Sequence, residues 1–126
     1  MQQAKFRHSF DFLFAAGRFA NCIEEQGPLY RQACFMSPNI VLRIVEQEEI
    51  APEKGSTTCL AFLVDPRNQN RWCMFEKAVE VMLGRNISGS ANIEELKRNV
   101  LDNIDSILLH VAQGNEPPFE DFSRYA

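Results

Sequence analysis

Residues 57–64 (TTCLAFLV) are the stretch of the chain that decides its fold class. The stretch carries no charged side chain and is rich in residues that favour β-strands. An apolar run of this length, bounded by turn residues, is typical of a strand buried inside a sheet. The loop that precedes it, residues 51–56 (APEKGS), contains a proline and a glycine and indicates a turn. The sequence therefore predicts a buried strand that begins directly after a short loop.

A second strand is predicted on the other side of this loop, over residues 40–50. Side chains alternate along it, with Ile40, Leu42 and Ile44 expected on one face and Val41, Arg43 and Val45 on the other. Because the connecting loop is short, we expect the two strands to pair antiparallel. Residues 28–36, which come before the turn signal at 37–39 (SPN), fit a short helix.

Residues 71–83 fit two different structures. A helix would place its apolar residues on one face and Glu76, Lys77 and Glu80 on the other, with Gly84 as its end. A strand is also compatible, because alternate residues from Cys73 onward are mostly apolar and an edge strand tolerates Lys77. Of the two, the helix is the favoured prediction.

Residues 93–113 carry a helical pattern. Isoleucine, leucine and valine recur three and four positions apart, as they do along one face of an amphipathic helix. Asn92 is the predicted N-cap, Glu95 completes a capping box, and Gly114 ends the helix. This pattern predicts a long C-terminal helix.

The N-terminal segment, residues 5–26, also shows helical spacing of apolar residues. Its apolar arc covers roughly 220°, far wider than the stripe of a surface helix. Five phenylalanines lie within it, at positions Phe6, Phe10, Phe12, Phe14 and Phe19. Such a helix is either central within its own domain or shared with another chain. In the second case Phe12, Phe19 and Ile23 would form the interface of a homodimer, since self-association requires only one apolar patch.

These elements predict an α+β fold for the chain. We expect a small antiparallel sheet of two or three strands, packed against long N-terminal and C-terminal amphipathic helices. The length of 126 residues is that of one domain. Residues 1–114 are assigned to this single domain, and residues 115–126 to an acidic and aromatic C-terminal tail.

Composition and charge limit the function classes. The formal net charge of −4 and the scattered basic residues argue against nucleic acid as a partner. No run approaches the ~20 apolar residues of a membrane span, so no membrane association is expected. Asp11 and Arg18 interrupt the N-terminal apolar run, which is unlike a secretory signal. We therefore expect a cytoplasmic protein with reduced cysteines.

The sequence contains no recognisable catalytic, metal or cofactor motif. Its cysteines are far apart and lack the paired spacing of zinc ligands, and it has no glycine-rich phosphate loop, so no metal and no cofactor are predicted. Only His8 and His110 are available as imidazole bases. The alternative to a binding protein is a small enzyme or ligand-binding domain with a reactive cysteine, such as Cys22 or Cys34 next to His110.

The tail (PPFEDFSRYA, residues 117–126) combines prolines, acids and aromatic residues. Three interpretations stay open: it packs back on the domain, it is disordered, or it is an extended motif that binds a partner. In the third case Phe119, Phe122 and Tyr125 would make the contacts.

The function class favoured by these features is a small intracellular protein-binding domain: an adaptor, an inhibitor or a chaperone-like protein. We expect it to act as a homodimer and to bind another protein. An acidic chain with an amphipathic first helix, a short sheet and a final helix resembles the small secretion chaperones in outline. The resemblance is one of shape and assigns no residue a role.

Overall fold

The computed structural model of the chain describes residues 8–48, 57–87 and 92–125. Within these ranges the chain forms one antiparallel sheet of six strands, and each strand pairs with its neighbours in the sequence. The strands are β1 (Asn21–Gln26), β2 (Tyr30–Met36), β3 (Val41–Glu48), β4 (Thr57–Asp65), β5 (Asn68–Met74) and β6 (Glu120–Asp121). The helices are η1 (Asp11–Gly17), α2 (Phe75–Ala78), η2 (Val79–Leu83), α3 (Ile93–Ala112) and η3 (Ser123–Tyr125).

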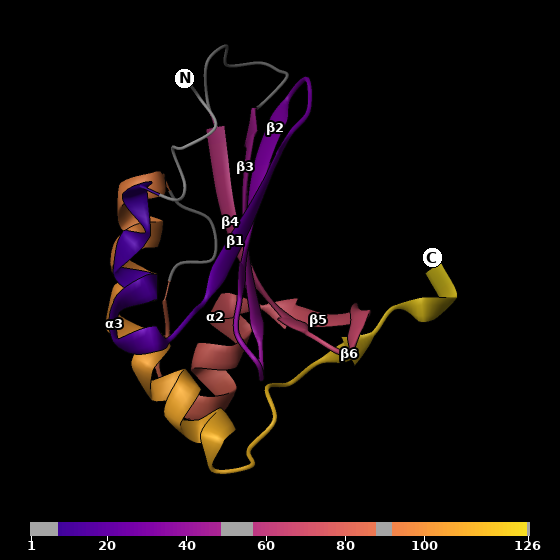
Figure 1. The fold of residues 1–126 in the computed structure, drawn as a ribbon. Helices are drawn as coiled ribbons and strands as arrows, with labels where there is room; N and C mark the ends of the chain where they lie inside the picture. The colour runs from indigo at the N-terminus through magenta and orange to yellow at the C-terminus, as the bar shows by residue number, and fades with distance from the viewer. Residues whose placement is uncertain (1–7, 49–56, 88–91, 126) are drawn as a thin grey trace.

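The two faces of the sheet have different neighbours. Figure 1 shows η1, α2 and α3 together on one side of β1–β4, while β5, β6 and the C-terminal end extend away on the other side. We call the face under these helices the inner face and the opposite face the outer face. The chain is therefore an α+β protein with one helical layer on one side of its sheet.

Alternation along the strands selects the residues of the inner face. Phe35 of β2 pairs with Leu42 of β3, which pairs with Leu63 of β4, so these three side chains lie in one row across the sheet. The next row contains Ala33, Ile44 and Ala61. All six are at most 1% exposed.

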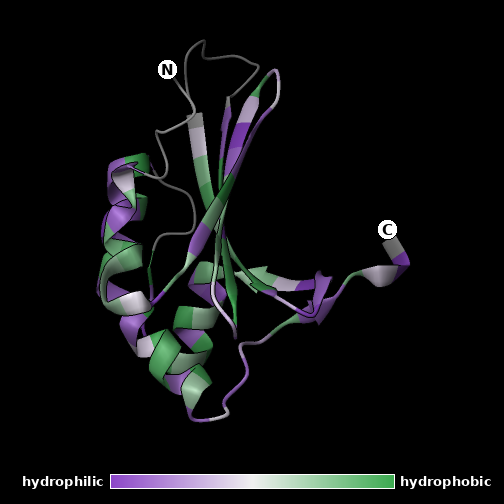
Figure 2. Cartoon of the chain, in the orientation of Figure 1, coloured by the Kyte–Doolittle hydropathy of each residue, from purple (hydrophilic) through white to green (hydrophobic). Residues whose placement is uncertain are grey.

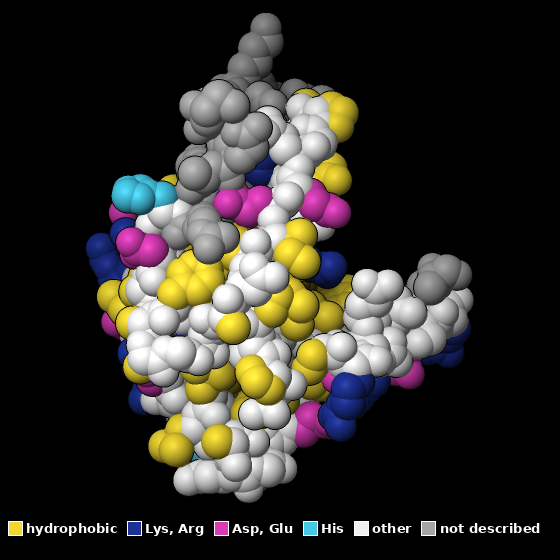
Figure 3. Space-filling view, viewed as in Figure 1, with side chains coloured by type: hydrophobic (Ala, Val, Ile, Leu, Met, Phe, Trp, Pro, Cys, Tyr) yellow, Lys and Arg dark blue, Asp and Glu magenta, His cyan; other side chains and the backbone are white. Residues whose placement is uncertain are grey.

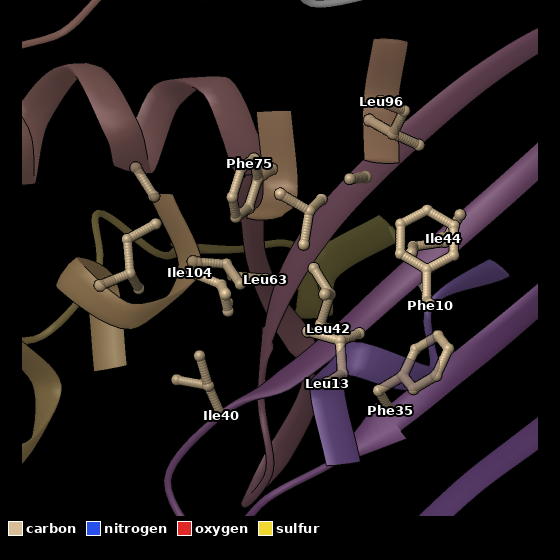
Figure 4. Close-up of a cluster of buried hydrophobic side chains, with 14 of the residues drawn as sticks. Phe10, Leu13, Phe35, Ile40, Leu42, Ile44, Leu63, Phe75, Leu96 and Ile104 are labelled. Atoms are coloured by element: carbon tan, nitrogen blue, oxygen red, sulfur yellow. The ribbon is translucent and has the colours of Figure 1, made fainter. Parts of the chain in front are cut away.

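The helical layer completes this core. Phe10, Leu13 and Phe19 come from the segment around η1, and α3 adds a stripe that ends with Ile104 and Ile107. Figure 4 shows Phe10, Leu13 and Ile104 directed toward the inner-face residues Phe35, Leu42 and Leu63. The core is thus a contact between one sheet face and helices from both ends of the chain.

The strands and the helix with the strongest patterns lie where the sequence predicts them. β3 and β4 pair antiparallel with Val41 opposite Val64, and α3 covers the predicted 93–113 segment. The Asn92 side chain accepts a hydrogen bond from the Glu95 amide at 2.9 Å, so it caps α3 as expected.

The prediction of a two- or three-stranded sheet with a long N-terminal helix is wrong. Helical structure at the N-terminus ends near Gly17, because Ala16 and Gly17 have φ angles of 56° and 70°, which no α-helix contains. The chain then forms β1 and turns at 27–29 into β2, where a short helix was expected. The Gly27-Pro28 pair is therefore the start of a hairpin loop and not the end of a helix.

The segment 71–83 combines the two alternatives that its pattern allows. β5 ends at Met74, α2 begins at Phe75, and Gly84 ends η2 with a φ of 69°. The tail contributes a further strand, because Glu120 and Asp121 pair with Trp72 and Arg71 of β5. The sheet is consequently larger than predicted at both of its edges.

The orientation of α3 can be tested with two substitutions on the same helix. Ile104 is 1% exposed and Leu109 is 59% exposed. We expect Ile104→Ala to lower the free energy of unfolding by about 2–5 kcal/mol, because it leaves a cavity in the core. Leu109→Ala should change it by at most about 0.5 kcal/mol. Denaturant titration measures both values, and equal losses would contradict the orientation of the helix.

Candidate functional site

The outer face of the sheet is the part of the molecule where side chains gather without a covering layer. It carries a hollow of about 390 Å³ formed by β1–β4 and the turn that follows β4. Figure 3 shows this side of the molecule as concave, between the upper part of the strands and the C-terminal arm. Its walls combine apolar and polar side chains: Ile23, Cys34, Met36, Val41, Val64 and Pro66 on the one hand, and Glu25, Gln32, Arg43, Asp65 and Gln69 on the other.

Strand register brings these residues together from separate parts of the sequence. One row across the sheet contains Ile23, Cys34, Arg43, Phe62 and Met74, from β1 to β5. The adjacent row contains Met36, Val41, Val64 and Trp72. Both rows are thus mainly apolar, although no helix of the described residues covers them. Figure 2 shows apolar stretches along these strands, next to polar ones.

Arg43 is the cationic side chain within this apolar surface. Its guanidinium carbon lies 5.1 Å from the centre of the Phe62 ring, a distance typical of a cation–π contact. Its Nε atom is buried and has no hydrogen-bond partner, and no carboxylate in the described part of the chain forms an ion pair with it. A buried cationic donor without an acceptor is costly. The outer face therefore offers an unused charged donor among apolar side chains.

Cys34 on the outer face and Cys73 on the inner face are both poor candidates for nucleophilic catalysis. Burial raises the pKa of the Cys34 thiol, and Glu25 adds to this effect while Arg43 opposes it. Burial, together with Glu120 and Glu76, raises the pKa of Cys73 to about 12. Both side chains are therefore protonated at neutral pH, whereas a catalytic cysteine requires a thiolate. No group of three potential metal ligands is found among the described residues.

A cluster of charged residues joins β4, β5 and the tail beside the hollow. The Asp65 carboxylate is 3% exposed and accepts a hydrogen bond from Arg71 Nη1 at 2.5 Å and from the Arg67 amide at 2.9 Å. Burial alone would raise the pKa of Asp65, but the hydrogen bonds from Arg67 and Arg71 outweigh it, so the pKa lies below its usual value of 3.8. Arg71 also bonds Glu116 at 3.1 Å and lies 5.3 Å from the Phe119 ring centre.

The tail residues predicted to bind a partner contact the domain itself. The Phe122 ring stacks on Trp72, with their centres 4.3 Å apart, and the Phe122 amide donates to the Asn70 carbonyl at 2.7 Å. Phe119 packs against the edge of the core. The side chain of Tyr125 lies outside the described residues. Binding of a partner by this tail stays a prediction.

The three residues predicted for a dimer interface do not share a surface. Phe19 is 1% exposed within the core, and Phe12 is half-buried with its ring centre 5.8 Å from that of Phe10. Ile23 is 53% exposed and belongs to β1, on the outer face. The single helix that was expected to carry all three residues is not formed by the described part of the segment. The expected helical stripe therefore does not exist as a surface.

Sequence reasoning did not identify the outer face as a site. One signal for it was present, because Arg43 lies between Val41 and Val45 in an otherwise apolar alternating strand. The remaining residues come from β1, β2 and β4, and only the strand register shows that they are neighbours.

Comparisons with protein-family models, with curated proteins and with solved structures find no match for this chain. None of the described helices has the length and apolar character needed to cross a bilayer.

Asp65 should control both the position of the tail and the acid stability of the protein. A carboxylate whose pKa is lowered on folding stabilises the protein above its unfolded pKa, and this contribution is lost as the pH falls through the folded pKa. We expect Asp65→Asn to lower the unfolding free energy at pH 7 and to flatten its dependence on pH below about 4. Fluorescence of Trp72, the single tryptophan, should also change as Phe122 moves away.

The matched control for this experiment is Asp105→Asn. Asp105 also pairs with an arginine, Arg18 at 2.6 Å, but its side chain is 63% exposed. An exposed pair contributes little, so this variant should retain the stability and the fluorescence of the wild type. Equal effects of the two substitutions would contradict a special role of Asp65.

Alkylation rates test whether the cysteine thiols are protonated and unreactive in the native protein. In the native protein at pH 8, we expect iodoacetamide to leave Cys59 and Cys73 unmodified until the chain unfolds, because both are buried. Mass spectrometry of peptides from native and denatured samples gives the extent of reaction at each position. Rapid modification of Cys73 or Cys34 in the native state would support the alternative of a reactive cysteine.

Proposed function

We propose that this chain is a protein-binding domain that receives a partner polypeptide on the outer face of its sheet. The partner segment presents apolar side chains to the two rows of the outer face and a carboxylate to Arg43. The observation that carries this proposal is the apolar character of a sheet face that has no covering layer among the described residues.

Antiparallel sheets with one face in water normally have polar side chains on that face. Here the outer positions of β3 and β4 are mainly apolar: they are Val41, Arg43, Val45 and Gln47 in β3, and Thr58, Leu60, Phe62 and Val64 in β4. A large apolar patch that remains uncovered in a water-soluble domain generally marks an interaction surface. The apolar composition of the outer face therefore favours a binding role.

The charge of Arg43 favours an acidic group in the partner. Guanidinium groups bind carboxylates through paired hydrogen bonds, which are strong where surrounding apolar side chains exclude water. Because Arg43 has no ion pair in the described part of the chain, such a carboxylate would not need to displace an existing partner. An extended segment with one acid between apolar residues matches this arrangement.

We also propose a cytoplasmic location. None of the four cysteines is in a disulfide, which suits a reducing compartment. This part of the proposal concerns the environment of the protein and is independent of the partner.

Peptide display tests the binding proposal. Selection from a random peptide library on the immobilised wild-type protein should enrich peptides that contain an acid flanked by apolar residues. A selected peptide should bind Arg43→Glu at least about tenfold more weakly, as expected for loss of a charge-assisted hydrogen bond. Circular dichroism and the melting temperature verify that the variant is folded.

The control substitution is Leu101→Glu, which introduces the same charge at a 51% exposed position on α3. It should leave peptide binding unchanged, because α3 packs on the inner face. Selected peptides without an acid, or peptides that bind Arg43→Glu as tightly as the wild type, would contradict the proposal.

A further inference from the structure

Aromatic side chains form a diagonal line across the outer face, with Arg43 at one end. The Arg43 guanidinium lies over the ring of Phe62, and the Phe62 and Trp72 rings meet edge to face, with their centres 5.2 Å apart. At the other end, Trp72 stacks on Phe122 with an interplanar angle of 23°. The line thus runs from β3 through β4 and β5 to the C-terminal tail.

The register of the tail places Phe122 on the outer face. Glu120 lies opposite Trp72 in the pairing of β5 with β6, so both residues share this face. Phe122 comes two positions after Glu120 and is therefore directed to the same side. Its amide continues the ladder, because it donates to the Asn70 carbonyl at 2.7 Å. The chain therefore covers part of its own proposed binding surface with one aromatic side chain.

The contacts that hold the tail beside Trp72 lie largely at the molecular surface. β6 has two residues, and both are exposed. The ion pair of Arg71 with Glu116 involves an acid that is 52% exposed, and pairs of this kind contribute little to stability. Figure 1 shows β5, β6 and the C-terminal end as an arm that stands away from the helical layer. A segment with these properties opens at a lower free-energy cost than the core.

We propose that the tail is an internal competitor of the partner, and that the partner stacks an aromatic side chain on Trp72 in place of Phe122. This inference rests on the binding function proposed above. The tail occupies the aromatic end of the line, whereas no carboxylate of the described residues forms an ion pair with Arg43 at the other end. A partner with both an aromatic residue and an acid makes both contacts and therefore displaces the tail.

The distance between Arg43 and Trp72 restricts the sequence of the partner. The two residues lie on β3 and β5, which are separated by two strand spacings, or about 10 Å. An extended chain covers this distance in roughly two to four residues. The partner segment therefore carries an acid and an aromatic residue at this separation. Hydrogen bonds to Arg43 and stacking on Trp72 then act together.

Peptide selection on a variant that lacks the competing ring tests this inference. Full-length Phe122→Ala, immobilised and exposed to a random peptide library, should enrich peptides with an acid and an aromatic residue roughly two to four positions apart. These peptides should bind Phe122→Ala about three- to tenfold more tightly than they bind the wild type, the factor expected for removal of one competing aromatic pair. Circular dichroism and the melting temperature verify that the variant is folded.

The matched control is Phe12→Ala, which removes a half-buried ring on the helical side of the sheet. This variant should bind the selected peptides with the affinity of the wild type. In the wild type itself, NMR follows the Phe122 amide, whose hydrogen bond to Asn70 belongs to the docked tail. A saturating concentration of peptide should move this resonance to its position in an unstructured chain, because the tail then leaves β5.

The outcomes separate this inference from the binding proposal. Peptides that depend on Arg43, bind Phe122→Ala no more tightly than the wild type and leave the Phe122 resonance in place would overturn the inference while the binding proposal stands. Peptides that release the tail and bind Phe122→Ala more tightly, yet bind Arg43→Glu with undiminished affinity, would uphold the displacement of Phe122 and contradict the proposed contact with Arg43. Failure to enrich any peptide would overturn both.

Discussion

Phe35, Leu42 and Leu63 lie in one row across β2, β3 and β4, and their burial under η1 and α3 fixes the direction of the other side chains in these strands. Side chains alternate with a period of two, so a shift of the register by one residue would expose this row and bury Arg43. Because exposing the apolar row and burying a charge are both unfavourable, the observed register is strongly preferred. The outer face is therefore a consequence of the inner one: Val41, Arg43 and Val64 face outward because Leu42 and Leu63 face the helices.

The C-terminal segment is attached by different forces. Asp65 holds Arg71 across the turn between β4 and β5, and Arg71 in turn contacts Glu116 and Phe119 of the tail. Stacking of Phe122 on Trp72 continues the outer face beyond β5. Hence electrostatic contacts, one aromatic pair and the packing of Phe119 against the edge of the core position this edge of the sheet.

The parts of the fold that the sequence predicts are those with local signals. The N-cap at Asn92 and the repeating apolar stripe identify α3, and short loops with alternating or continuous apolar runs identify β3 and β4. For the N-terminal segment the local signal gives the wrong structure. Its phenylalanines are spaced as on a helix, although the segment forms only a short helix followed by β1. Phe10 and Phe19 in fact reach the core from a short helix and from the chain that follows its left-handed turn at Ala16 and Gly17.

Long-range pairing accounts for what the sequence does not reveal. β1 and β5 carry many polar residues, so neither has the apolar alternation of a strand, and β6 is defined only by its contacts with Arg71 and Trp72. The outer face assembles residues from β1 to β5, and no short motif connects them. The only local signal for this surface in the sequence is the charged Arg43 between Val41 and Val45.

Hydroxyl-radical footprinting of the isolated chain measures the difference between the two sheet faces most directly. Met36, Trp72 and Met74 belong to the outer face and are half-buried, whereas Phe35, Phe10 and Phe75 are at most 1% exposed. The observed register predicts rapid oxidation of the first three residues and protection of the other three. Protection of Met36 and Met74 together with oxidation of Phe35 would contradict the assignment of the inner and outer faces, and with it the proposed binding surface.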